Sequence, residues 1–280
     1  MYIKNRVSAL KFVEYGGSQI ETSRILTKSK KYKEAIFFFQ QAAENTTKAL
    51  GYFCLNINPR EVKHTAVEIS KQSINKFIFE MEKFKNYPEK LKNKGSDSGL
   101  LGPLFNLLTP IIDNVNSMAK VAISVIDKLE DESKNTDYGR DIWLKTLYIN
   151  DADSKEALEK ALKFSTEYNS SNFDSIYEII EAFVELLDGT SKLPQINEAV
   201  KYAREMSYLL KSTVLAVDLF HFNYLGYMHQ QPTRYPKLDP KDYWDNDVYT
   251  EDTELVKKLP ELILQLEALN KEIYKLINEF

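Results

Sequence analysis

Apolar and small residues recur with a helical period of about 3.6 between Tyr32 and Phe53. This pattern predicts a long amphipathic helix, followed by a loop at Asn58-Pro59 and by His64 at the start of the next helix. The apolar stripe of the predicted helix consists of Ala35, Phe38, Phe39, Ala42, Ala43, Ala49, Leu50 and Phe53.

Three polar residues of the same segment are spaced so that they share one helical face. Gln41, Glu44 and Lys48 lie three and four positions apart. Two interpretations are open. Glu44 and Lys48 form an ordinary ion pair on a solvated face, or the three side chains belong to a binding site.

The rest of the chain also follows helical spacing and shows little of the alternation that is typical of strands. With nine glycines and nine prolines among 280 residues, this predicts an all-α protein. Gly16-Gly17 is predicted to end the first helix, Ser18 and Glu21 to cap the second as a capping box, and residues 88–99 to form a linker. Further helices are predicted over 2–14, 18–29, 62–84, 104–130, 138–149, 154–168, 173–187, 194–228 and 251–279.

Charge and cysteine content restrict the classes of function. The net charge is −4 with 37 basic and 41 acidic residues, so no global basic field attracts nucleic acid, and any such contact requires a local patch. The single cysteine, Cys54, is predicted to be a small core residue in a reducing, cytoplasmic protein. The N-terminal segment has no continuous apolar region that would indicate a signal peptide. The apolar run over 209–225 is interrupted by Lys211, Asp218 and His221, which argues against a membrane span.

Two separated fragments resemble the HEPN domains that accompany minimal nucleotidyltransferases in prokaryotes. The first is Gln41-Ala42-Ala43-Glu44 with Lys48-Ala49-Leu50 and Lys63-His64-Thr65, preceded by Tyr32 and Ala35. The second is Thr233-Arg234-Tyr235-Pro236, followed by Tyr249-Thr250-Glu251-Asp252. Together they cover about residues 18–87 and 194–280. The resemblance implies an antiparallel HEPN-like helical bundle with a helical insertion of about 100 residues. The corresponding division is 1–99 for the first half of the core, 100–190 for the insertion and 191–280 for the second half.

Ribonuclease members of that family carry an Arg-x4–6-His motif, and this chain departs from it. Arg60 precedes His64 by four positions, which is one residue too close, and Arg234 has no histidine after it. The resemblance therefore implies the fold without the nuclease, and no catalytic residue is assigned. The sequence also has no motif for a phosphate loop, a dinucleotide site or a zinc site, so we expect no metal and no cofactor.

The three histidines have different expected roles. His64 is either a polar residue of the interhelical groove near Glu44 and Lys48 or a helix-capping residue, and we favour the cap. His221 lies in an apolar helix and is expected to be a core or interface histidine with satisfied hydrogen bonds. His229 begins the loop over 229–250 and is expected to be exposed.

The loop over 229–250 is the best candidate for ligand binding. Arg234 offers a guanidinium group suited to phosphate, and Tyr235, Tyr243, Trp244 and Tyr249 offer aromatic faces on which a base could stack. Alternatively, Arg234 pairs with Glu44 across the bundle as a structural clasp, which we favour slightly.

The leading hypothesis for function is a non-enzymatic protein that binds a nucleotide or RNA and a protein partner, without membrane association. The family resemblance implies a homodimer and a nucleotidyltransferase partner in a toxin–antitoxin or defence module. The alternatives are a divergent ribonuclease that uses Arg60, His64 or Arg234, and a helical scaffold for protein–protein interaction. The candidate ligand-binding residues are Arg234, Tyr235, Gln41, Glu44, Lys48, His64 and Tyr243.

Overall fold

The computed structural model describes residues 5–55, 66–85, 136–148, 194–235 and 246–279, with scattered positions in 109–127 and 239–244. Almost all of these residues are helical and none of them lies in a strand, so the predicted all-α class is confirmed. The elements are α1 (Arg6–Lys28), α2 (Tyr32–Leu55), α3 (Ala66–Lys85), α6 (Thr136–Tyr148), α9 (Pro194–Tyr227), α10 (Gln230–Arg234), a 3-10 turn η2 (Asn246–Val248) and α11 (Glu254–Glu279).

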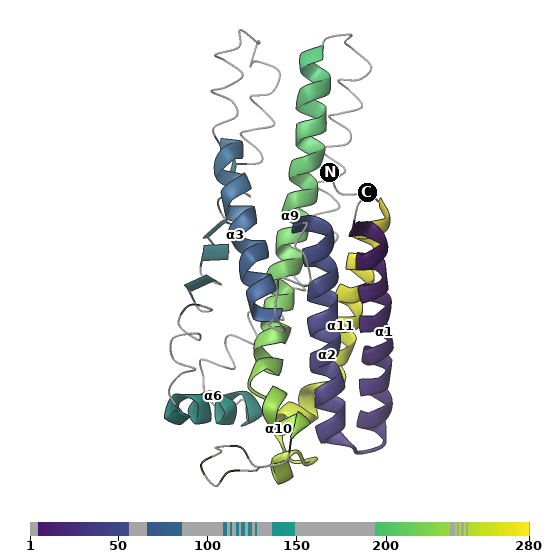
Figure 1. The fold of residues 1–280 in the computed structure, drawn as a ribbon, viewed down its shortest axis with the longest axis vertical. Coiled ribbons are helices and arrows are strands. Elements are labelled where there is room, and N and C mark those ends of the chain that lie inside the picture. Colours follow the sequence, from purple (N-terminus) through teal and green to yellow (C-terminus); the bar gives the residue numbers. More distant parts are fainter. Residues whose placement is uncertain are drawn as a thin grey trace.

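The long helices form an elongated bundle (Figure 1). Helices α1, α2, α3, α9 and α11 run along its long axis, while α6 lies across one end, close to the short helix α10. The first and last of the described helices are neighbours, and Arg6 of α1 donates a hydrogen bond to the backbone carbonyl of Asn278 of α11 at 3.0 Å. Among the described residues, no helix is long and apolar enough to cross a membrane.

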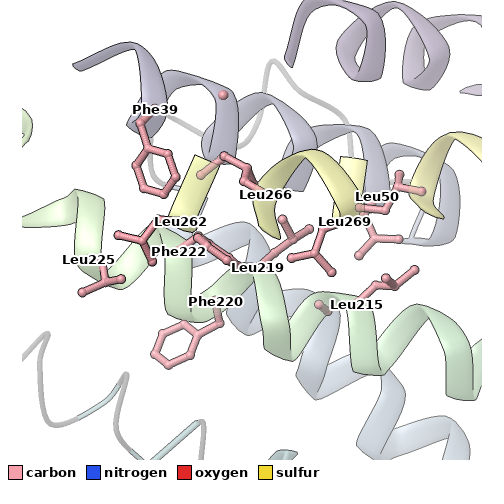
Figure 2. Close-up of a cluster of buried hydrophobic side chains, with 14 of the residues drawn as sticks. Phe39, Leu50, Leu215, Leu219, Phe220, Phe222, Leu225, Leu262, Leu266 and Leu269 are labelled. Atoms are coloured by element: carbon pink, nitrogen blue, oxygen red, sulfur yellow. The ribbon is translucent and has the colours of Figure 1, made fainter. Parts of the chain in front are cut away.

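The core lies where α2, α9 and α11 meet (Figure 2). Side chains from all three helices point into it, because each helix repeats apolar residues every three or four positions. Helices α2 and α11 are in contact, so segments about 200 residues apart in sequence share one core. The domain boundaries remain a prediction. The labelled core residues are Phe39 and Leu50 of α2, Leu215, Leu219, Phe220, Phe222 and Leu225 of α9, and Leu262, Leu266 and Leu269 of α11.

The predicted break at Gly16-Gly17 is wrong, because α1 continues through both glycines. A Cβ atom at Gly16 would lie 2.8 Å from Oγ1 of Thr46 in α2 and 3.1 Å from Nδ2 of Asn270 in α11. Gly16 therefore allows three helices to approach closely. Ser18 lies inside α1, where its carbonyl accepts a hydrogen bond from Thr22, and does not cap a second helix.

The turn between α1 and α2 sets the antiparallel direction of these two helices. Lys30 adopts the left-handed conformation with φ of 58°. Its backbone N–H donates to the carbonyl of Thr27 at 3.1 Å, which closes the end of α1. The Lys30 side chain forms an ion pair with Glu251 at 2.6 Å, so this turn lies beside the segment that leads into α11.

Other predicted boundaries agree with the structure to within a few residues. The helices predicted over 32–53, 138–149 and 194–228 correspond to α2, α6 and α9. The closing helix begins at Glu254, three residues later than predicted, and the expected loop over 229–250 contains α10 and η2. The predictions for the linker over 88–99 and the helices over 154–168 and 173–187 lie outside the described residues.

Candidate functional site

The predicted polar face of α2 is present and is drier than expected for a solvated ion pair. Lys48 and Glu44 form an ion pair one helical turn apart, and their side chains are only 17% and 8% exposed. Nε2 of Gln41 donates to the second carboxylate oxygen of Glu44 at 3.5 Å. The carboxylate of Glu44 therefore has partners on its own helix.

Arg234 lies at the end of α10 and is directed toward α2. Its guanidinium carbon lies 5.5 Å from the centroid of the Phe37 ring, a cation–π contact, while the residue as a whole remains exposed. Tyr235, which follows α10 in extended conformation, is 50% exposed. Helix α10 is held by Thr233, whose hydroxyl donates to the carbonyl of His229 at 2.5 Å. An arginine and a tyrosine thus lie at the surface beside the first turns of α2.

The predicted clasp between Arg234 and Glu44 is wrong. Phe37 and Glu44 are seven residues apart on α2, which corresponds to about 10 Å along the helix. Arg234 contacts Phe37, whereas Glu44 is engaged by Lys48 and Gln41. Of the described residues, no carboxylate forms an ion pair with Arg234. The guanidinium therefore keeps its hydrogen-bond donors available on the side away from the ring.

His229 is buried, which corrects the expectation that it is exposed. Its Nδ1 lies 2.9 Å from the hydroxyl of Tyr249, and its ring packs 6.4 Å from that of Trp143 in α6. Burial lowers the pKa of His229 to about 3, so the ring is neutral at physiological pH. The histidine connects the end of α9 to α6 and to the segment before α11. Because Tyr249 is buried in this contact and Trp244 packs against the core, neither is a free stacking face.

Helix α9 carries two further buried titratable groups on its course through the core. Burial raises the pKa of Asp218 to about 8, and its Oδ1 has no hydrogen-bond partner. Burial lowers the pKa of His221 to about 4, an effect that the backbone of Val217 opposes. Nδ1 of His221 has no hydrogen-bond partner, so the expectation of a histidine with satisfied hydrogen bonds is wrong. At neutral pH both groups are therefore uncharged. In the sequence, Asp218 was apparent only as a charge within an apolar run, and that isolation was the signal of an unusual carboxyl group.

Cys54 has the core position that the sequence predicted. Its thiol lies 3.2 Å from the hydroxyls of both Tyr208 and Ser212. Burial raises its pKa to about 11, which keeps the unreactive thiol form at neutral pH. A buried thiol with so high a pKa is a poor nucleophile.

The structure brings together some of the predicted site residues and leaves others undetermined. Gln41, Glu44 and Lys48 form one cluster, and Arg234 with Tyr235 forms another about two helical turns away along α2. Arg60, His64 and Tyr243 lie outside the described residues. The described part of the chain contains no group of three or more histidine, cysteine, aspartate or glutamate residues arranged to hold a metal ion.

No family model, no curated protein and no solved structure matches this chain. The resemblance to HEPN domains thus rests on the sequence fragments alone.

Proposed function

We propose that the protein is a non-enzymatic, HEPN-like binding protein that holds a nucleotide or an RNA segment at Arg234 and Tyr235. The observation that carries the proposal is the guanidinium group of Arg234, exposed and lying over the Phe37 ring. Such a contact positions the guanidinium without using its N–H donors. Those donors are suited to the oxygens of a phosphate group, with which arginine forms charge-assisted hydrogen bonds.

Aromatic side chains around Arg234 suit the second requirement of a nucleotide, which is a stacking surface. Tyr235 follows Arg234 directly and is half exposed. Phe37 and Phe38 pack edge to face with ring centroids 5.3 Å apart, and both remain partly accessible. A base that stacks on an accessible aromatic face gains roughly 1–3 kcal/mol without sequence preference.

The two described histidines give no support to the ribonuclease alternative. General acid–base cleavage of RNA requires an accessible imidazole that titrates near neutral pH. Burial lowers the pKa of His221 to about 4 and that of His229 to about 3. Neither ring is suited to exchange protons with a substrate. The alternative therefore depends on Arg60, His64 or Arg234. The spacing of Arg60 and His64 departs from the nuclease motif, and Arg234 has no histidine after it.

The protein partners in this proposal are a second copy of the chain and a nucleotidyltransferase, as part of a toxin–antitoxin or defence module. This part rests on the sequence resemblance. Co-purification of the chain with a nucleotidyltransferase encoded beside it, together with a dimeric mass in solution, is the expected result.

The ligand proposal is tested by fluorescence anisotropy with labelled ATP, labelled GTP and a labelled single-stranded RNA. We expect binding that weakens with salt. Arg234→Ala should weaken it at least tenfold, equivalent to about 1.4 kcal/mol. Arg234→Lys should restore it only in part, because an ammonium group lacks the planar fork of donors.

Lys11→Ala is the matched control, since Lys11 is an exposed cation in the first turns of α1, far along the chain from α10. It should leave affinity unchanged. Absence of binding by the wild-type protein, or equal affinity of Arg234→Ala and wild type, would refute the proposal. RNA recovered intact supports a non-enzymatic role. Cleavage that disappears in both Arg60→Ala and His64→Ala would establish the ribonuclease alternative.

A further inference from the structure

Three consecutive residues of α2 form hydrogen bonds with three different helices. Nδ2 of Asn45 donates to Oε1 of Gln19 in α1 at 2.7 Å. Oγ1 of Thr46 accepts from Nδ2 of Asn270 in α11 at 3.0 Å, and Oγ1 of Thr47 accepts from Nδ2 of Asn223 in α9 at 2.6 Å. Successive residues of an α-helix point about 100° apart, so these contacts fix α2 from three directions at one level. We call the six residues Gln19, Asn45, Thr46, Thr47, Asn223 and Asn270 the polar layer.

The polar layer is as dry as the apolar core around it. Each of its six residues is less than 10% exposed. Asn270 is further constrained, because its amide also donates to the backbone carbonyl of Val13 at 3.1 Å. The absence of a side chain at Gly16 makes room for Thr46 and Asn270 to meet. Buried amides and hydroxyls are costly when they lose their partners, so this layer is favourable in one alignment of the helices.

The surrounding core does not impose a single alignment by itself. Helices α2, α9 and α11 present repeating apolar residues to one another, mainly leucine and phenylalanine (Figure 2). A shift of one helix by one turn, about 5.4 Å, again places apolar residues opposite apolar residues. The same shift separates the donors of the polar layer from their acceptors.

We propose that the polar layer is a register lock, which selects one alignment of α2 against α1, α9 and α11 and does so without adding to net stability. Buried polar contacts act in this way in coiled coils, where a single asparagine specifies register at a cost in stability. The Glu44–Lys48 ion pair lies on the remaining side of α2 at this level, the side that faces none of these three helices through the polar layer.

The test removes the polar layer and measures the alignment of α2 against α11. Spin labels are placed at Glu34→Cys near the start of α2 and at Lys275→Cys near the end of α11, which are exposed positions well separated along the bundle, so that a shift along the helix axis changes their distance. Cys54 is buried and remains unlabelled. Distance distributions from electron–electron double resonance are compared for the wild-type layer and for two replacements. One has leucine at Gln19, Asn45, Asn223 and Asn270 with valine at Thr46 and Thr47. The other has alanine at all six positions and adds no volume.

With the wild-type layer we expect one narrow distance distribution. Both replacements should retain helical circular dichroism and show a broad distribution or a second population displaced by up to about 5.4 Å, the rise of one helical turn. A single narrow distribution in either replacement would overturn the proposal. Loss of helical content in both would also overturn it, since the layer would then supply stability and not alignment.

The matched control removes two buried hydroxyls that bond only within their own helices. Thr213 donates to the carbonyl of Leu209 at 2.9 Å in α9, and Ser73 donates to that of Ile69 at 2.7 Å in α3. The double variant Thr213→Val, Ser73→Ala should keep the narrow distribution. If it broadens to the same extent, any loss of buried polar groups has this effect and the lock is refuted.

Discussion

Replacement of Asp218 by asparagine should stabilise the protein by an amount that increases with pH. Burial raises the pKa of Asp218 from 3.8 to about 8. Between these two values the folded state holds a proton that the unfolded state has released. The contribution of this carboxyl group to stability is therefore fully present below pH 4 and is lost as the pH rises to about 8.

The loss amounts to about 1.4 kcal/mol per pH unit, or about 4 kcal/mol by pH 7 as an upper limit. Asparagine has nearly the shape of the protonated acid and does not ionise, so Asp218→Asn avoids the loss. Urea unfolding followed by circular dichroism at pH 5, 6, 7 and 8 measures the difference. Asp141→Asn, at an exposed position on α6, is the control and should change little at any pH. A stability difference for Asp218→Asn that is constant from pH 5 to pH 8 would show that the carboxyl group is not buried as described.

Two further substitutions test the helix contact at Gly16 and the buried histidine. Gly16→Ala should cost about 1–3 kcal/mol in urea unfolding, because the new methyl group meets Thr46 and Asn270. Gly17→Ala is its matched control, with ordinary spacing around the new atom, and should gain about 0.5–1 kcal/mol from helix propensity; equal effects at both positions would contradict the close approach. The pKa of His229 is lowered to about 3, so its contribution to stability is present above its ordinary pKa of 6.5 and is lost as the pH falls toward 3. In the same assay, His229→Phe should reduce the loss of unfolding free energy at acid pH by up to about 1.4 kcal/mol per pH unit. An unchanged loss of stability below pH 6.5 would show that His229 is not buried in its neutral form.

Helical periodicity was sufficient to predict the long elements, because their buried faces repeat every three or four residues. It located α2, α6 and α9 closely, and it identified Cys54 as a core residue. It failed at Gly16-Gly17, where local propensity indicates a stop and tertiary packing requires a small residue. The reason for the glycine lies on α2 and α11, far from it in sequence.

The candidate site was predictable only in part. The periodicity of a helix shows which of its residues share a face, but it does not show at which level along the axis another helix packs against that face. Spacing predicted the Glu44–Lys48 pair correctly. The pairing of Arg234 with Glu44 was wrong because α10 reaches α2 at Phe37, two turns earlier. His229 was expected to be exposed because it begins an aromatic, proline-rich loop. Its burial depends on Trp143 and Tyr249, which come from two other segments.

The packing of α1 and α2 against α11 has a consequence for synthesis on the ribosome. Helices α1 and α2 are complete at Leu55, but the helix that covers them ends at Glu279, so more than 200 residues must be added in between. At about 5–20 residues per second, covering of the α1–α2 hairpin by the later helices is complete only after roughly 10–45 s. Until α9 is made, the nascent chain lacks Phe222, against which the buried Phe39 ring packs in the finished protein. The α1–α2 hairpin is therefore the segment on which nascent-chain chaperones should act, and slow translation of the later helices should increase aggregation.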